Sequence, residues 1–159
     1  MKRNVFLDKL NKFLCKLNKK YCINDGGCCF VASILAEMFD KYNIKYSLVI
    51  QATDYKDSKE VENEIKSNKA NYDAEDSCVM FGTCDHYSLQ VENYGIINDY
   101  QEYYSDGCPV DYYYYKFDNI SAKDIAWIYS NGIWNTKYSI KQNKLISNLL
   151  KDFFKWKID

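Results

Sequence analysis

A strong charge of one sign, a long apolar run and paired cysteine motifs are all missing from this chain. Lys and Arg number 21 against 22 Asp and Glu, so the formal net charge of -1 offers no overall basic surface for nucleic acid. No apolar run approaches the roughly twenty residues that cross a bilayer, and the first residues do not resemble a signal-peptide core. We therefore expect no nucleic-acid partner, no membrane association and a cytoplasmic location.

The seven cysteines offer neither a disulfide framework nor a zinc knuckle. Their number is odd, the chain is not small, and no C-x-x-C pair occurs. Cys22 and Cys28 are separated by five residues, as are Cys78 and Cys84, which is wider than the usual zinc spacing. Only one histidine, His86, is present to join them. We expect reduced thiols, no metal and no cofactor.

The composition supports one α+β domain spanning residues 1 to 159. Apolar residues make up 47% of the chain, enough for a substantial core. Apolar side chains at three- and four-residue spacing predict helices over 5–21, 29–42 and about 139–156, the second of them apolar over a wide face. Ser121 and Asp124 have the spacing of a helix N-cap box, and Gly132 supplies the stop of that helix.

Short β-type runs predict the sheet: 45–52, 78–81, 86–91, 94–99 and 112–117. The two residues Glu92-Asn93 separate two of these runs and indicate a hairpin, hence an antiparallel sheet. Residues 54 to 76 are rich in acids and poor in apolar side chains. We interpret them as a solvated flap inserted between strands, with a substrate-binding lid as the alternative.

One set of residues has the order used by thiol enzymes. Cys29 begins an apolar helix, and both a helix N-terminus and a neighbouring imidazolium lower the pKa of a thiol. His86 stands on a predicted strand, and Asp99, or Asn98 beside it, follows on the next strand where it can hold the second ring nitrogen. Cys28 stays open as the nucleophile, because periodicity does not place the first helical turn to one residue.

The same residues resemble the transglutaminase-like branch of the papain-like cysteine peptidase superfamily. The matching segments are Gly26-Gly27-Cys28-Cys29-Phe30 followed by Ala32, then His86-x-x-Leu89-x-Val91, then an Ile-Ile-x-Asp99 strand. That branch typically carries a G-x-C-x-x-x-A helix start, then H-x-x-x-x-V, then a hydrophobic strand ending in Asp. A weaker similarity to arylamine N-acetyltransferases comes from the Gly-Gly-x-Cys-Phe string.

The resemblance covers about residues 24 to 99 and implies a fold and a site. The fold would be a central helix carrying the cysteine, packed on an antiparallel sheet that carries histidine and aspartate. Cys29 would be the nucleophile, His86 the base and Asp99 the orienting residue. Papain relatives place a glutamine six residues before the thiol to help bind the oxyanion, and Ile23 stands there, so Asn24 or the Cys29 backbone amide would take that role.

These residues predict a cysteine hydrolase, a protease or deamidase that acts on peptide or amide bonds through an acyl-thioester. Its substrate would be a protein or a small amide. If an amine replaced water in the second step, the enzyme would be a transamidase or acyltransferase. The alternative is a non-catalytic binding module of the same fold, for example a phage protein that binds a host factor. The oligomeric state does not follow from the sequence.

Overall fold

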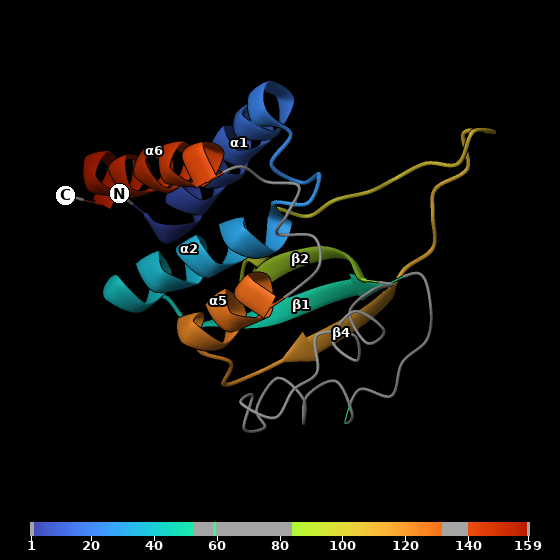
Figure 1. Cartoon of the computed structure of the whole chain (residues 1–159). Helices are drawn as coiled ribbons and strands as arrows, with labels where there is room; N and C mark the ends of the chain where they lie inside the picture. Colours follow the sequence, from blue (N-terminus) through green and yellow to red (C-terminus); the bar gives the residue numbers. More distant parts are fainter. Residues whose placement is uncertain (1, 53–58, 60–83, 132–139, 159) are drawn as a thin grey trace.

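The computed structural model describes residues 2–52, 59, 84–131 and 140–158. Within these ranges the chain forms four helices and a four-stranded antiparallel sheet (Figure 1). The elements follow in the order α1 (Arg3–Tyr21), α2 (Cys28–Lys41), β1 (Tyr46–Ala52), β2 (Cys84–Val91), β3 (Gly95–Ile97), β4 (Tyr113–Phe117), α5 (Ala122–Asn131) and α6 (Ile140–Ile158). The predicted α+β class and antiparallel sheet are confirmed.

Three sequence predictions lie outside the described residues. They are the strand over 78–81, the helix stop at Gly132 and, except for Lys59, the acidic excursion over 54–76. The transglutaminase-like architecture within the α+β class stays a prediction.

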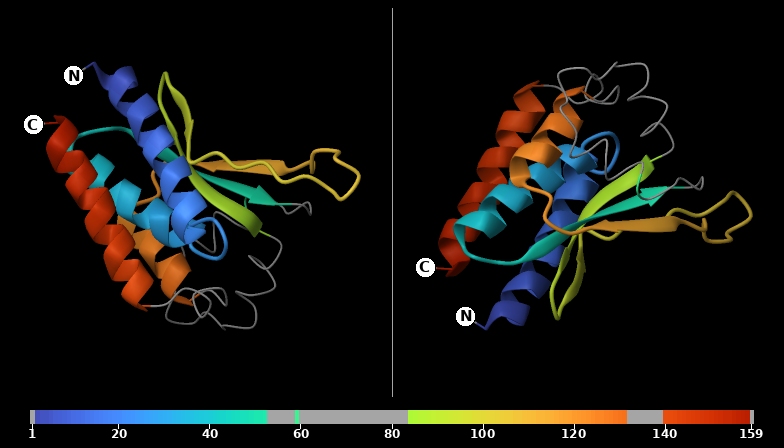
Figure 2. Two further views of the ribbon diagram at one scale, coloured as in Figure 1. Left: turned by 90° about the horizontal axis from the view of Figure 1, so that it is seen from above. Right: turned by 90° about the horizontal axis from the view of Figure 1, so that it is seen from below.

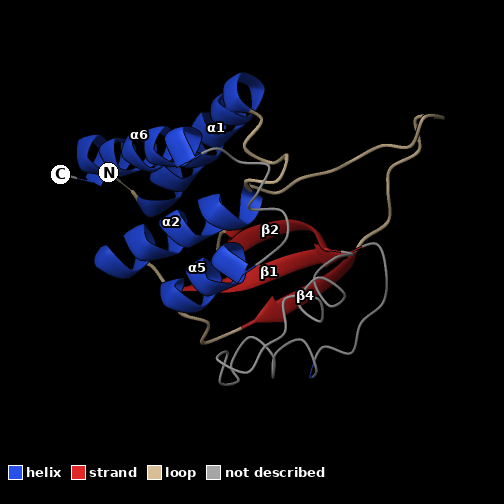
Figure 3. Cartoon of the chain, viewed as in Figure 1, coloured by secondary structure: helices blue, strands red, loops and turns tan. Residues whose placement is uncertain are grey.

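The sheet has the strand order β3-β2-β1-β4. Figure 3 shows three of these strands, β2, β1 and β4, side by side. β1 pairs antiparallel with β2 along one edge and with β4 along the other. β3 pairs with β2, so β3 and β4 are the two outer strands, and the chain between them passes from one edge of the sheet to the other. In the β1–β2 pair, Ile50 stands opposite Tyr87 and Gln51 opposite His86. A bulge between Gln51 and Ala52 shifts the register just beyond this last pair.

Alternation along the strands gives the sheet two different faces. Leu48, Ile50, Tyr87 and Leu89 belong to the main apolar core together with α2, which packs against β2. α5 and α6 pack against α2 in turn, and α1 contacts α6, so the helices gather on one side of the sheet (Figure 2). The opposite parity holds Val49, Gln51, His86 and Ser88, which are also buried.

α2 is the central helix because nearly every turn of it is apolar. Ten of its residues are buried: Cys28, Cys29, Val31, Ala32, Ser33, Ile34, Leu35, Ala36, Met38 and Phe39. The helix begins at Cys28, one residue earlier than the sequence predicted, after Gly26 has taken a positive φ of 80° that favours glycine. Even so, no described helix combines the length and hydropathy needed to cross a bilayer.

Local hydrogen bonds fix the start of α5 as the sequence predicted. The Asp124 amide donates to the Ser121 hydroxyl oxygen at 3.2 Å, and the Ser121 amide donates to the Asp124 carboxylate at 3.0 Å. These two bonds are a reciprocal capping box, which satisfies amides that the helix cannot bond itself. The box therefore anchors α5 directly after β4.

The β2–β3 hairpin differs from its prediction in two respects. Val91 pairs with Gly95, so the connection holds three residues instead of the expected Glu92-Asn93 pair. Positive φ values of 59° at Asn93 and 134° at Gly95 make this longer turn possible. The strand predicted over 94–99 is also shorter, because it ends at Ile97 and Asn98 takes a positive φ of 63° that turns the chain away.

Candidate functional site

His86 lies on β2 with its side chain fully enclosed, 0% exposed. Its Nε2 is 2.6 Å from the backbone carbonyl oxygen of Asn98, which follows β3. A carbonyl oxygen only accepts hydrogen bonds, so Nε2 must carry a proton. In the neutral ring the lone pair then belongs to Nδ1, which is the nitrogen that can accept a proton.

Asn98 connects His86 to α1 and to the loop before α2. Its backbone amide donates to Asn11 Oδ1 on α1 at 2.9 Å, and its side-chain Nδ2 donates to Asn24 Oδ1 at 3.0 Å. Asn24 stands in the short loop that leads into α2. The structure thus brings together three of the residues singled out in the sequence, namely His86, Asn98 and Asn24.

The surroundings of His86 favour its neutral form. Burial lowers the pKa of the imidazole below the ordinary value of 6.5, because an enclosed cation loses its hydration. The Asn98 carbonyl and the negative charges of Asp99 and Glu102 oppose this shift. The Tyr100 ring covers the imidazole with a centroid distance of 5.3 Å. At neutral pH the lowered pKa therefore favours the neutral imidazole.

Asp99 lies near His86, and its side chain is exposed. Its carboxylate accepts a hydrogen bond from the Tyr100 amide at 3.0 Å, and its charge acts on the imidazole from a distance. The neighbouring carbonyl of Asn98 makes the bond to Nε2. The role of Asp99 as the residue that orients the ring stays a prediction.

Cys28 and Cys29 occupy the first turn of α2, where unpaired helix amides favour a negative charge. Cys29 is fully enclosed, and its thiol donates to the Ile125 carbonyl oxygen on α5 at 3.7 Å. Burial raises the pKa of Tyr129, also on α5, and the neighbouring Cys29 adds to that shift. Cys28 is 6% exposed. None of these hydrogen bonds joins a sulfur to the imidazole. His86 also belongs to the strand parity opposite to that of Tyr87 and Leu89, which share the core with α2. The contact between thiol and base therefore stays a prediction.

Two small clefts border the His86 region. One, of about 290 Å³, is lined by Asn11, Asn18, Asn24, Asn98, Tyr100 and Gln101, among others. The second, of about 340 Å³, shares Asn18, Asn24 and Tyr100 with the first and adds the acids Asp25 and Glu102. Amide groups and carboxylates therefore line both clefts, and His86 is in the lining of neither.

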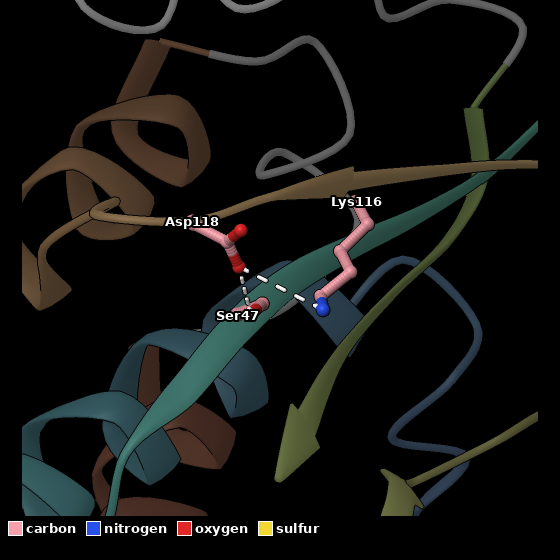
Figure 4. A network of polar contacts seen from close by, with 3 residues as sticks. All are labelled: Ser47, Lys116 and Asp118. Carbon is pink, nitrogen blue, oxygen red and sulfur yellow. Dashed lines mark hydrogen bonds and ion pairs between the residues drawn. The ribbon is translucent and has the colours of Figure 1, made fainter. Parts of the chain in front are cut away.

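A larger cleft lies elsewhere, and its lining includes no histidine or cysteine. It measures about 940 Å³ and includes Ser47, Lys116 and Asp118 (Figure 4). The Ser47 hydroxyl donates to the Asp118 carboxylate, which also forms an ion pair with Lys116 at 3.8 Å. Both charged side chains are more than half exposed, so water screens the pair. We place the candidate site at His86 because size alone does not supply a nucleophile and a base.

Within the described ranges, no three His, Cys, Asp or Glu side chains gather into a group that could hold a metal ion. Comparison of the chain with models of protein families, with curated proteins and with solved structures finds no match. The resemblance to transglutaminase-like proteins consequently stays a prediction based on the motifs alone.

The sequence interpretation missed two features of this region. Asn11 carries no signal in the sequence, because it is one of several polar positions on an amphipathic helix. The sequence did contain a signal for Cys28. In the G-x-C-x-x-x-A pattern, Gly26 and Ala32 stand at the required positions before and after Cys28. If Cys29 is taken as the cysteine of the pattern, Ser33 stands where alanine is required. The spacing of this motif therefore favours Cys28 over Cys29.

Proposed function

We propose that the chain is a cysteine hydrolase that cleaves peptide or amide bonds, with a thiol from the first turn of α2 as nucleophile and His86 as base. The observation that carries the proposal is the 2.6 Å contact between His86 Nε2 and the Asn98 carbonyl. It assigns the proton to Nε2 and leaves Nδ1 as the basic nitrogen of the chain's only histidine.

Cys28 is the better nucleophile of the two adjacent cysteines. The thiol of Cys29 donates to the Ile125 carbonyl. A thiolate at that place would face the negative end of the same carbonyl, which raises the cost of ionisation. Cys28 shares the helix N-terminus and is slightly exposed. The sequence prediction of Cys29 is retained as the alternative.

The reaction would have two stages that share one proton carrier. Nδ1 of His86 accepts the thiol proton as sulfur attacks the carbonyl carbon, and the imidazole then gives this proton to the departing amine. The acyl-thioester that forms is attacked by water, whose proton passes to the imidazole and then to the released thiol. Backbone amides at the start of α2, or the Asn24 side chain, would bind the oxyanion.

Alkylation by iodoacetamide near pH 7 tests the proposal, because three other cysteines provide internal references. Cys15, Cys22 and Cys108 are exposed, so accessibility alone makes them react first. An ordinary thiol with a pKa of about 8.5 is only a few per cent ionised at this pH, so full ionisation would raise its rate roughly thirtyfold. We expect Cys28, although buried, to be labelled at least about tenfold faster than the three exposed cysteines.

The variants Cys28→Ser, Cys29→Ser and His86→Ala complete the alkylation experiment. Fast labelling should disappear in Cys28→Ser, persist in Cys29→Ser, and fall to or below the rate of the exposed cysteines in His86→Ala. Site-resolved mass spectrometry identifies each adduct. If the three exposed cysteines react first and both α2 thiols stay unmodified, thiol catalysis is refuted.

A non-catalytic binding module is the second candidate, and exposed aromatic side chains favour it. Tyr103, Tyr104, Tyr113 and Tyr114 are each at least half exposed. Tyrosine supplies large contact area at low cost in conformational entropy and is enriched at protein interfaces. Slow labelling of the α2 thiols, with the tyrosines required for association with a partner protein, would support this candidate.

A further inference from the structure

Three asparagines from separate parts of the fold meet beside His86. Asn98 uses its backbone amide to reach Asn11 on α1 and its side-chain amide to reach Asn24 in the loop before α2. The Asn24 backbone amide in turn donates to Asn18 Oδ1 on α1 at 2.9 Å. Residue 98 is thus tied on two sides, while its carbonyl oxygen points to the imidazole.

The backbone of Asn98 needs this support because its conformation is unusual. Its φ of 63° lies in the left-handed region, which costs most residues about 1–2 kcal/mol and which asparagine tolerates better than most. The direction of its carbonyl follows from that conformation. A relaxed backbone at residue 98 would therefore turn the acceptor away from Nε2.

We propose that Asn11 and Asn24 are positioning residues that act through Asn98: they aim its carbonyl at His86 and thereby keep the proton of the neutral ring on Nε2. This inference rests on the proposed function only for the use of Nδ1 as the base. The tautomer itself is a property of the folded chain and can be measured without a substrate.

Tyr100, Asp99 and Glu102 do not select one nitrogen of the ring. Tyr100 packs its ring against the imidazole, and Asp99 and Glu102 contribute negative charge from a distance. These charges stabilise the protonated ring without a hydrogen bond to one chosen nitrogen. The Asn98 carbonyl does select a nitrogen, since it requires a donor at Nε2.

Long-range ¹H–¹⁵N correlation spectra of ¹⁵N-labelled protein test the inference near pH 7.5, about one unit above the ordinary histidine pKa. With one histidine in the chain, the spectra contain a single set of imidazole signals. We expect the Nε2–H tautomer in the parent chain. In Asn11→Ala and in Asn24→Ala, the ratio of Nε2–H to Nδ1–H should fall up to about tenfold, the effect of losing one ordinary hydrogen bond.

Asn4→Ala is the matched control, because Asn4 lies on the same helix as Asn11 and is exposed. It should leave the ratio unchanged. An Nδ1–H tautomer in the parent chain, or ratios within twofold of the parent in both folded variants, would overturn the inference. Far-ultraviolet circular dichroism verifies that each variant is folded.

A second comparison keeps the test decisive if an alanine variant does not fold. Asn98→Gly keeps the carbonyl and accepts the positive φ, but removes the donor to Asn24. Asn98→Gly should lower the ratio of Nε2–H to Nδ1–H as Asn24→Ala does. The double variant Asn24→Ala/Asn98→Gly should show no further decrease, because both substitutions remove the same hydrogen bond between residues 24 and 98. No change in Asn98→Gly, or additive effects, would count against the inference. Absence of thiol activation in a parent chain with the Nε2–H tautomer would instead refute the proposed function.

Discussion

Mild acid should destabilise the folded chain through His86. Burial holds the folded-state pKa of this ring below 6.5, the value expected for the unfolded chain. Well above pH 6.5 the ring is neutral in both the folded and the unfolded chain, so its titration does not change the free energy of unfolding. As the pH falls below 6.5, the unfolded chain binds a proton that the folded chain does not bind, so the free energy of unfolding decreases.

The size of this effect is bounded by a single proton. One proton bound only by the unfolded state gives a slope of at most about 1.4 kcal/mol per pH unit. Because the onset is gradual, the loss between pH 6.5 and 5.5 is at most about 1 kcal/mol, reached if the folded chain binds no proton in this range. For a chain of this length that limit corresponds to a decrease of about 2–4 °C in the melting temperature.

Urea unfolding followed by tryptophan fluorescence measures this loss at a series of pH values, in the presence of a reductant. His86→Gln is the reference, since an amide does not titrate and the carboxylates of the two proteins contribute alike. The parent chain should lose more stability than the variant over this pH unit, by up to about 1 kcal/mol. Equal losses in the two proteins, or a parent chain that becomes more stable on acidification, would refute the argument from burial.

Further predictions concern the neighbours of His86 and the start of α5. Tyr100→Ala should expose the imidazole and raise its pKa toward 6.5. Asp99→Asn should lower the pKa of His86 further, because it removes a nearby negative charge. An NMR titration of the single histidine measures both shifts. A shift opposite to either direction would contradict the assignment. Ser121→Ala should cost about 1 kcal/mol in urea unfolding through loss of the capping box, and a change below about 0.3 kcal/mol would show that the box contributes little.

The helices and most strands could be predicted because their signals are local. Apolar spacing identified α1, α2 and α6 to within a few residues, and the Ser121–Asp124 pair identified the start of α5. The β2–β3 connection was predicted one residue too short. The sequence does not show where Asn93 and Gly95 adopt positive φ values, and these values set the length of the turn.

The histidine environment could be predicted only in part. A search for side-chain partners pointed to Asp99 or Asn98, but the atom that contacts Nε2 is the backbone carbonyl oxygen of Asn98. Every residue has such a carbonyl, so residue type does not predict this contact. The ties from Asn11 and Asn24 depend on how α1 docks beside β3, a long-range contact with no local pattern. Motif order led to the prediction of His86 as a catalytic base, whereas long-range packing determines which groups surround its ring.

The chain that passes from β3 to β4 contacts His86 through the Asn98 carbonyl and the Tyr100 ring. This stretch is fastened at both ends in strands, and on the way the Gln51 side chain donates to the Tyr100 carbonyl at 3.0 Å. A segment that is anchored at both ends cannot rotate away about a single hinge. Movement of the segment away from the sheet near Tyr100 would therefore require the bond from Gln51 to break.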